Sequence, residues 1–173
     1  MDIMLKKYQE KAVTELVEVT SSLIKKDDCK PICVFQAPTG SGKTIMTAGY
    51  ISSLITELSD VDLCFLWISI GKGNLHLQSK EKLERYFKGY PKVSLVEDDY
   101  LGGKQIIQKN EVVVVNWEKL RNKDSTTQEW KNTLMKDGET VNFREVLANT
   151  RRHRKIIMII DESHIGANAD RTT

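Results

Sequence analysis

A glycine-rich loop followed by a lysine and a threonine is the part of this sequence best equipped for chemistry. The Walker A pattern, with alanine in place of its first glycine, is matched by Ala37-Pro38-Thr39-Gly40-Ser41-Gly42-Lys43-Thr44. Gly40 and Gly42 allow a tight turn that aims backbone N–H groups at phosphate oxygens. Lys43 can reach the β- and γ-phosphates of a nucleotide, and the Thr44 hydroxyl can ligate Mg²⁺. We therefore expect a loop that binds ATP with Mg²⁺.

An acidic pair after an apolar run could supply the second half of such a site. The run Ile156–Ile160 leads directly into Asp161 and Glu162. An aspartate at this position holds Mg²⁺ through water, and the adjacent glutamate is placed to polarise an attacking water. Such a pair can also be a mere helix cap, but the phosphate-binding loop favours chemistry. The predicted catalytic residues are Lys43, Asp161 and Glu162, and the predicted metal ligands are Thr44 and Asp161.

The rest of the chain predicts the elements that must position these side chains. Apolar periodicity predicts helices at Tyr8–Ile24, Ile45–Leu58 and Leu75–Phe87. Short apolar runs predict strands at Ile32–Phe35, Leu63–Ile68, Val93–Val96, Val112–Val115 and Ile156–Ile160. Strands that are apolar on both faces are typical of parallel sheets covered by helices. The alternation predicts an α/β fold with a doubly wound, mostly parallel sheet, whose strands all end at one edge.

Length and composition agree with one domain. The 173 residues are 40% hydrophobic, and 26 basic against 24 acidic side chains leave a net charge of +2, which excludes a uniformly cationic nucleic-acid binder. No apolar run approaches the roughly 20 residues that span a bilayer. Because charged residues lie near the N-terminus, we expect no signal peptide there. Three cysteines without zinc spacing predict reduced thiols and a cytoplasmic location.

A long polar stretch, 121–155, lies between the last two predicted strands. We expect it to form a helical excursion within a single lobe that spans residues 1–173. Its end, Arg151–Lys155, is the most basic run of the chain. Because this run precedes a strand, we expect it at the opposite edge of the sheet from the phosphate site, as a solvated loop.

Two further loops are expected at the same edge as the phosphate site, since each follows a predicted strand. Lysine and asparagine are residue types that contact nucleic-acid phosphates. Asn74 could instead simply cap the helix that begins at Leu75. The candidate nucleic-acid contacts in these two loops are Lys72, Gly73, Asn74, Asn116 and Lys119.

Taken together, these motifs resemble the first RecA-like lobe of a superfamily 2 (DEAD/DEAH-like) helicase or translocase. Within that group the chain is most similar to the restriction subunit of type III restriction enzymes. The loop at residues 37–44 matches motif I, and Asp161-Glu162-Ser163-His164 matches motif II in its DExH form. Leu5-Lys6-Lys7-Tyr8-Gln9 resembles the Leu-Arg-x-Tyr-Gln element of these proteins, with lysine in place of arginine. The resemblance covers nearly the whole chain and implies a three-layer αβα RecA-like P-loop NTPase domain.

The resemblance also implies roles for individual residues. Gln9 would read the adenine, Tyr8 would stack nearby, and His164 would couple the nucleotide site to a second lobe. Residues 67–75 resemble motif Ia, and residues 115–120 resemble the next nucleic-acid loop. The resulting set of expected cofactor-binding residues is Tyr8, Gln9, Pro38, Thr39, Gly40, Ser41, Gly42, Lys43, Thr44 and His164.

The function that the resemblance implies is that of the ATP-binding first lobe of a DNA-dependent ATPase of the type III restriction kind. Motif III, the second lobe with its arginine finger, and a nuclease domain are not found in the 173 residues. Because an arginine finger is worth about 10³–10⁵ in rate, we expect weak hydrolysis of ATP to ADP and phosphate. The implied partners are DNA or RNA, a second RecA-like lobe in a longer chain or in trans, and a methyltransferase subunit, without a membrane.

Two alternatives stay open at this point. A free-standing P-loop phosphotransferase, such as a small-molecule kinase, would need an arginine-rich lid within 121–154, and the Tyr8-Gln9 element together with the DExH motif argues against it. A nucleotide-binding adaptor without turnover is the other alternative. A screen for phosphoryl acceptors and an assay of turnover with DNA would separate the three.

Overall fold

Among the residues that the structure describes, four parallel strands form a central sheet in the order β2-β3-β1-β4. The computed structural model describes residues 3–26, 31–69, 74–96, 100, 103–117 and 143–161. The strands are β1 (Leu63–Ser69), β2 (Val93–Leu95), β3 (Val112–Asn116) and β4 (Lys155–Asp161). All three pairings are parallel, as the doubly apolar runs predict, so the strands end at one edge of the sheet.

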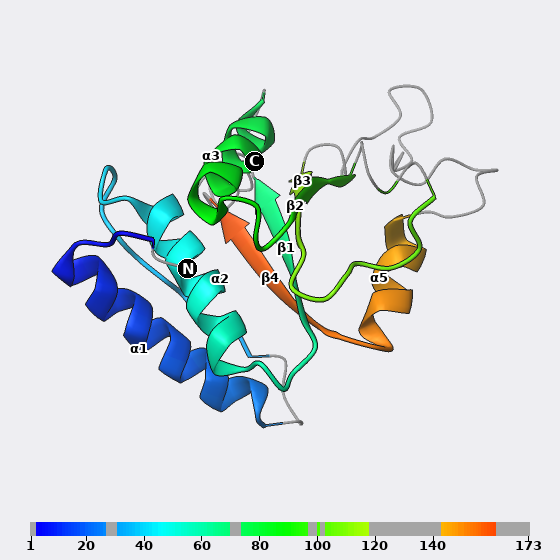
Figure 1. The fold of residues 1–173 in the computed structure, drawn as a ribbon, viewed down its shortest axis with the longest axis horizontal. Coiled ribbons are helices and arrows are strands. Elements are labelled where there is room, and N and C mark those ends of the chain that lie inside the picture. The colour runs from blue at the N-terminus through cyan, green and yellow to red at the C-terminus, as the bar shows by residue number, and fades with distance from the viewer. Residues whose placement is uncertain are drawn as a thin grey trace, which may run out of the picture.

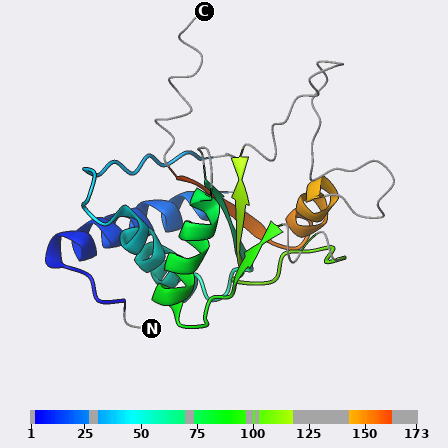
Figure 2. The same cartoon turned by 90° about the horizontal axis from the view of Figure 1, so that it is seen from above.

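Helices cover both faces of this sheet. They are α1 (Lys7–Ile24), α2 (Lys43–Glu57), α3 (Leu75–Phe87) and α5 (Phe143–Arg151). Helices α1, α2 and α3 lie on one side of the sheet and α5 lies on the other, as Figures 1 and 2 show. The expected α/β fold with three layers is therefore confirmed. None of the helices in the described ranges is long and apolar enough to cross a membrane.

The central strand β1 shows why its sequence lacks the alternation of a half-exposed strand. Phe65 and Trp67 belong to the core beneath α1, α2 and α3. Leu66 and Ile68 belong to a second core beneath α5. All seven residues of β1 are buried, because successive side chains enter opposite cores.

The expected strand at Ile32–Phe35 is wrong. The backbone there is irregular, and the side chains of Ile32 and Val34 are 89% and 83% exposed. Phe35 and Ala37 pack against the core beneath the first three helices, and β4 occupies the edge of the sheet. A short apolar run does not specify a hydrogen-bonded neighbour, and without one an extended segment stays outside the sheet.

The polar stretch before β4 contains the helix α5, and the helical excursion over 121–155 stays a prediction. Residues 118–142 lie outside the described part of the chain. The basic run before β4 lies at the amino end of that strand, opposite the carboxyl edge, as expected. There Lys155 Nζ donates a 2.9 Å hydrogen bond to the carbonyl oxygen of Ile24, the last residue of α1.

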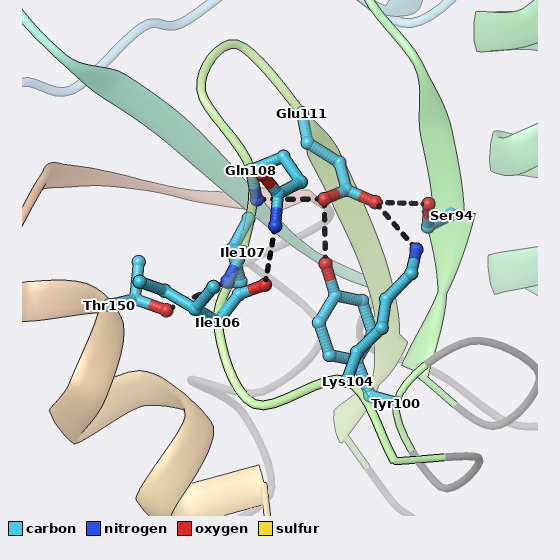
Figure 3. A network of polar contacts seen from close by, with 8 residues as sticks. All are labelled: Ser94, Tyr100, Lys104, Ile106, Ile107, Gln108, Glu111 and Thr150. Carbon is cyan, nitrogen blue, oxygen red and sulfur yellow. Dashed lines mark hydrogen bonds and ion pairs between the residues drawn. The ribbon is translucent and has the colours of Figure 1, made fainter.

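A buried carboxylate just before β3 organises the loop between β2 and β3. Glu111 is 1% exposed and accepts hydrogen bonds from the hydroxyls of Ser94 and Tyr100 and from the backbone N–H of Gln108 (Figure 3). The ammonium of Lys104 lies 3.5 Å from the same carboxylate. Burial raises the pKa of Glu111, but these hydrogen bonds and the lysine charge outweigh burial and leave the pKa below its ordinary value.

The same loop is tied to α5 by a threonine hydroxyl. Thr150 Oγ1 donates to the carbonyl oxygen of Val146 (2.6 Å) and accepts the backbone N–H of Ile107 (2.9 Å). Because Thr150 and Ile107 are fully buried, these bonds satisfy groups that water cannot reach.

Candidate nucleotide-binding site

The glycine-rich loop turns tightly before α2, as its sequence predicts. Gly40 and Gly42 have φ angles of +80° and +87°, a conformation that glycine adopts without strain. Between them, the N–H of Ser41 donates to the carbonyl oxygen of Pro38 at 3.2 Å. Gly42 is the N-cap of α2, and Lys43 is the first residue of that helix.

The lysine and the helix create positive charge at this loop. Lys43 Nζ donates a 3.3 Å hydrogen bond across the loop to the carbonyl oxygen of Ala37. The first turn of α2 contains no acidic residue, so the positive end of its dipole is not neutralised there. Thr44 follows Lys43 in that turn and is half-buried. An anion is the ligand that this arrangement favours.

The element that precedes motif I contacts the loop directly. Tyr8 Oη and Gln9 Nε2 both donate hydrogen bonds to the carbonyl oxygen of Ser41, at 3.0 and 2.9 Å. Gln9 is buried, and its Oε1 accepts the backbone N–H of Lys6 at 2.9 Å. The start of α1 is therefore attached to a loop that comes more than 30 residues later in the chain.

The expected Mg²⁺ ligand Asp161 is the last residue of β4. In the parallel register Asp161 is paired with Ser69, and Ser69 is paired with Asn116. Ile157 and Ile159 pack into the core beneath α1, α2 and α3, so alternation places Asp161 on that same face. Figure 1 shows the arrowheads of β1 and β4 toward the same end of the molecule as the first turn of α2.

The residues expected to contact nucleic acid lie in different environments. Asn74 is exposed at the N-cap of α3 and makes no side-chain capping hydrogen bond. Asn116 is buried, with its Nδ2 3.5 Å from His76 Nδ1, a buried histidine to which the sequence assigned no role. Contact of these two asparagines with nucleic acid stays a prediction. The predicted residues outside the described ranges are Glu162, His164, Lys72, Gly73 and Lys119.

The chain matches a known protein family over nearly its whole length. The family described as "Type III restriction enzyme, res subunit" matches residues 2–172. The chain belongs to this family. Among curated proteins and among solved structures there is no match.

Membership in the type III restriction enzyme res subunit family confirms the resemblance drawn from the motifs and agrees with the RecA-like α/β fold. It indicates an ATP-binding, helicase-like lobe and, in general, a hydrolase of the ATPase or helicase type. Nucleotide is the ligand typical of this family, usually with Mg²⁺.

Two features of the protein are absent from the predictions made from sequence. The attachment of Tyr8 and Gln9 to the Ser41 carbonyl joins side chains to a backbone atom, and no side-chain pattern encodes such a contact. The buried Glu111 could have been suspected, because a carboxylate directly before four valines must be either exposed or fully paired.

Proposed function

We propose that this chain is the ATP-binding lobe of a nucleic-acid-dependent ATPase that hydrolyses ATP to ADP and phosphate, as part of a type III restriction or helicase assembly. The observation that carries the proposal is the phosphate-binding loop at the start of α2, at the same end of the molecule as the carboxyl end of β4. In open α/β sheets, ligands bind at this edge.

The residues at this edge fit a magnesium-bound triphosphate. The Lys43 ammonium, now 3.3 Å from the Ala37 carbonyl, can turn to the β- and γ-phosphates. The buried Ser41 Oγ has no hydrogen-bond partner among the described residues, and a phosphate oxygen is the kind of acceptor that it lacks. Thr44 and Asp161 would hold the Mg²⁺, which when bound neutralises phosphate charge. Glu162 remains the proposed base that orients the attacking water.

The hydrogen bonds of Gln9 support its proposed role in reading adenine. One amide N–H is used on the Ser41 carbonyl, and one lone pair of Oε1 is used by the N–H of Lys6. A second N–H and a second lone pair are left on the same amide. This is the donor and acceptor pair that a glutamine offers to N7 and N6 of adenine. Tyr8 keeps an exposed ring beside it, as stacking on a base requires.

We also propose partners for this lobe and a slow rate of ATP turnover. Asn74, exposed at the carboxyl edge, supports contact of this edge with DNA or RNA. We propose a second RecA-like lobe and a methyltransferase subunit as protein partners, and cytoplasm as the location. From the 173 residues alone we expect slow turnover, since an arginine finger from a second lobe is worth about 10³–10⁵ in rate.

The test is the binding of Mg·ATP to wild type and to Lys43→Ala, measured by titration calorimetry. Loss of a buried, hydrogen-bonded charge partner costs about 2–5 kcal/mol, so affinity should fall by about 30-fold or more. The matched control is Lys80→Ala, which removes a lysine paired with Glu84 on the surface of α3. Unchanged ATP affinity in a folded Lys43→Ala variant would remove the phosphate-site assignment.

A further inference from the structure

Two donors from α1 converge on one backbone oxygen of the phosphate-binding loop. Tyr8 Oη and Gln9 Nε2 lie 3.0 and 2.9 Å from the carbonyl oxygen of Ser41. Gln9 also lies against the next residue, because a Cβ built on Gly42 would come within 2.7 Å of its Nε2. The start of α1 therefore binds the peptide between Ser41 and Gly42.

Because a peptide is planar, holding its carbonyl oxygen also fixes the direction of its N–H, which can contact the ligand. A trans peptide is planar, and its N–H points away from its carbonyl oxygen. Since the oxygen of Ser41 is held toward Tyr8 and Gln9, the N–H of Gly42 must point to the opposite side. Gly42 is the N-cap of α2, where N–H groups without intrahelical partners bind phosphate oxygens.

The loop itself does not hold this peptide in one orientation. Gly40 and Gly42 flank Ser41, and both have positive φ. Glycine reaches positive and negative φ about equally well, so a Gly-Ser-Gly segment has several conformations of similar energy. An external contact that selects one of them before the ligand arrives improves affinity, because ordering no longer opposes binding.

We propose that the Tyr8 hydroxyl is a positioning group for phosphate binding, and that together with Gln9 it orients the Ser41–Gly42 peptide so that the Gly42 N–H faces the phosphates. This inference rests on the proposed ATP site but goes beyond a ring that stacks on the base. It requires the hydroxyl of Tyr8, whereas stacking requires only the ring. It also predicts an effect on every ligand with a phosphate chain, whatever its base.

The test compares Tyr8→Phe with wild type for three ligands: ATP, GTP and inorganic tripolyphosphate, each with Mg²⁺, by titration calorimetry. The matched control is Tyr90→Phe, since Tyr90 is as exposed as Tyr8 (53%) and its hydroxyl also has a partner, Asn110 Nδ2 at 2.7 Å, away from the loop. Loss of one such hydrogen bond corresponds to about twofold to tenfold in an equilibrium. We expect Tyr8→Phe to weaken all three ligands by one common factor in this range. Tyr90→Phe should weaken none. Each variant loses one hydrogen bond of the free protein, so unfolding in denaturant should show a similar small loss of stability in both and a folded protein under the binding conditions.

Each other outcome overturns the inference. Unchanged affinity for all three ligands in Tyr8→Phe would show that the hydroxyl does not position the peptide, while wild-type binding of ATP would still support the proposed site. Weaker binding of ATP alone would assign Tyr8 to the base. Absence of wild-type binding to any of the three would overturn the proposed function and this inference with it.

Discussion

Replacement of Glu111 by glutamine tests whether the buried carboxylate organises the loop before β3. The change keeps the shape of the side chain and removes its charge. Glutamine must keep its oxygen toward the backbone N–H of Gln108 and the hydroxyl of Tyr100, because a backbone N–H can only donate. Its NH₂ then faces the Ser94 hydroxyl and the ammonium of Lys104.

The expected loss in free energy of unfolding follows from these four contacts. Hydrogen bonds to a charged acceptor contribute about 1.5–3 kcal/mol each and neutral ones about 1 kcal/mol, so two or three weakened bonds cost about 2–3 kcal/mol. Loss of the partly exposed Lys104 pair adds less than about 1 kcal/mol. Because a neutral side chain avoids the desolvation penalty of a buried charge, part of this loss is offset. We therefore expect Glu111→Gln to lower the free energy of unfolding by about 1–3 kcal/mol at pH 7.

The pH dependence gives an independent check. The pKa of Glu111 is lowered from its ordinary 4.5, so the carboxylate stabilises the fold fully above that pH. This contribution disappears as the pH falls through the lower pKa of the folded state. Urea unfolding at pH 7 and at progressively lower pH should show a gap between wild type and Glu111→Gln that closes on acidification.

The control is Glu84→Gln, which removes a surface ion pair with Lys80 and should cost less than about 1 kcal/mol. A Glu111→Gln variant within about 0.5 kcal/mol of wild type at pH 7 would refute the reasoning, since surface changes alone reach that size. A gap that stays constant with pH would refute it equally.

Two further predictions concern buried groups. Thr150→Val leaves the buried N–H of Ile107 without its 2.9 Å acceptor and should cost about 1–3 kcal/mol in urea unfolding. The control is Thr56→Val on the exposed side of α2, because the Thr56 hydroxyl donates to the carbonyl of Ser52 as that of Thr150 does to Val146, but accepts no buried N–H. It should cost much less, and equal costs would contradict the argument. Burial raises the pKa of the Cys64 thiol to about 12, whereas Cys33 is exposed. In a Cys29→Ser background, a disulfide reagent should therefore titrate one thiol in the native protein and two in denaturant. Two thiols that react rapidly in the native protein would show that Cys64 is accessible.

The local parts of the fold and of the site were predictable because their information is local. The Walker A loop depends on consecutive residues, and its two glycines have the positive φ angles that the pattern requires. Helix α3 begins and ends where the apolar period predicts, and the carboxylate after the last apolar run does end a strand. In the loop and in the helix, neighbours in sequence determine the conformation.

The prediction of a strand at Ile32–Phe35 was wrong for the opposite reason. Its composition is that of a buried strand, but a strand needs a partner, and the partner is a property of the whole sheet. Likewise, the parallel register that aligns Asn116, Ser69 and Asp161 depends on how three separate segments pair.

By itself, the sequence determined which residues could bind a phosphate chain, that the fold is α/β with a parallel sheet, and the family resemblance that the comparison confirms. Only the tertiary structure decided that Tyr8 and Gln9 meet on the Ser41 carbonyl, that Asn116 turns to His76, and that Glu111 is buried among four partners. The physical reason is the range of the interactions. Turns and helices follow from bonds between close neighbours in the chain, whereas hydrogen bonds between distant segments form only after packing has brought their atoms within about 3 Å.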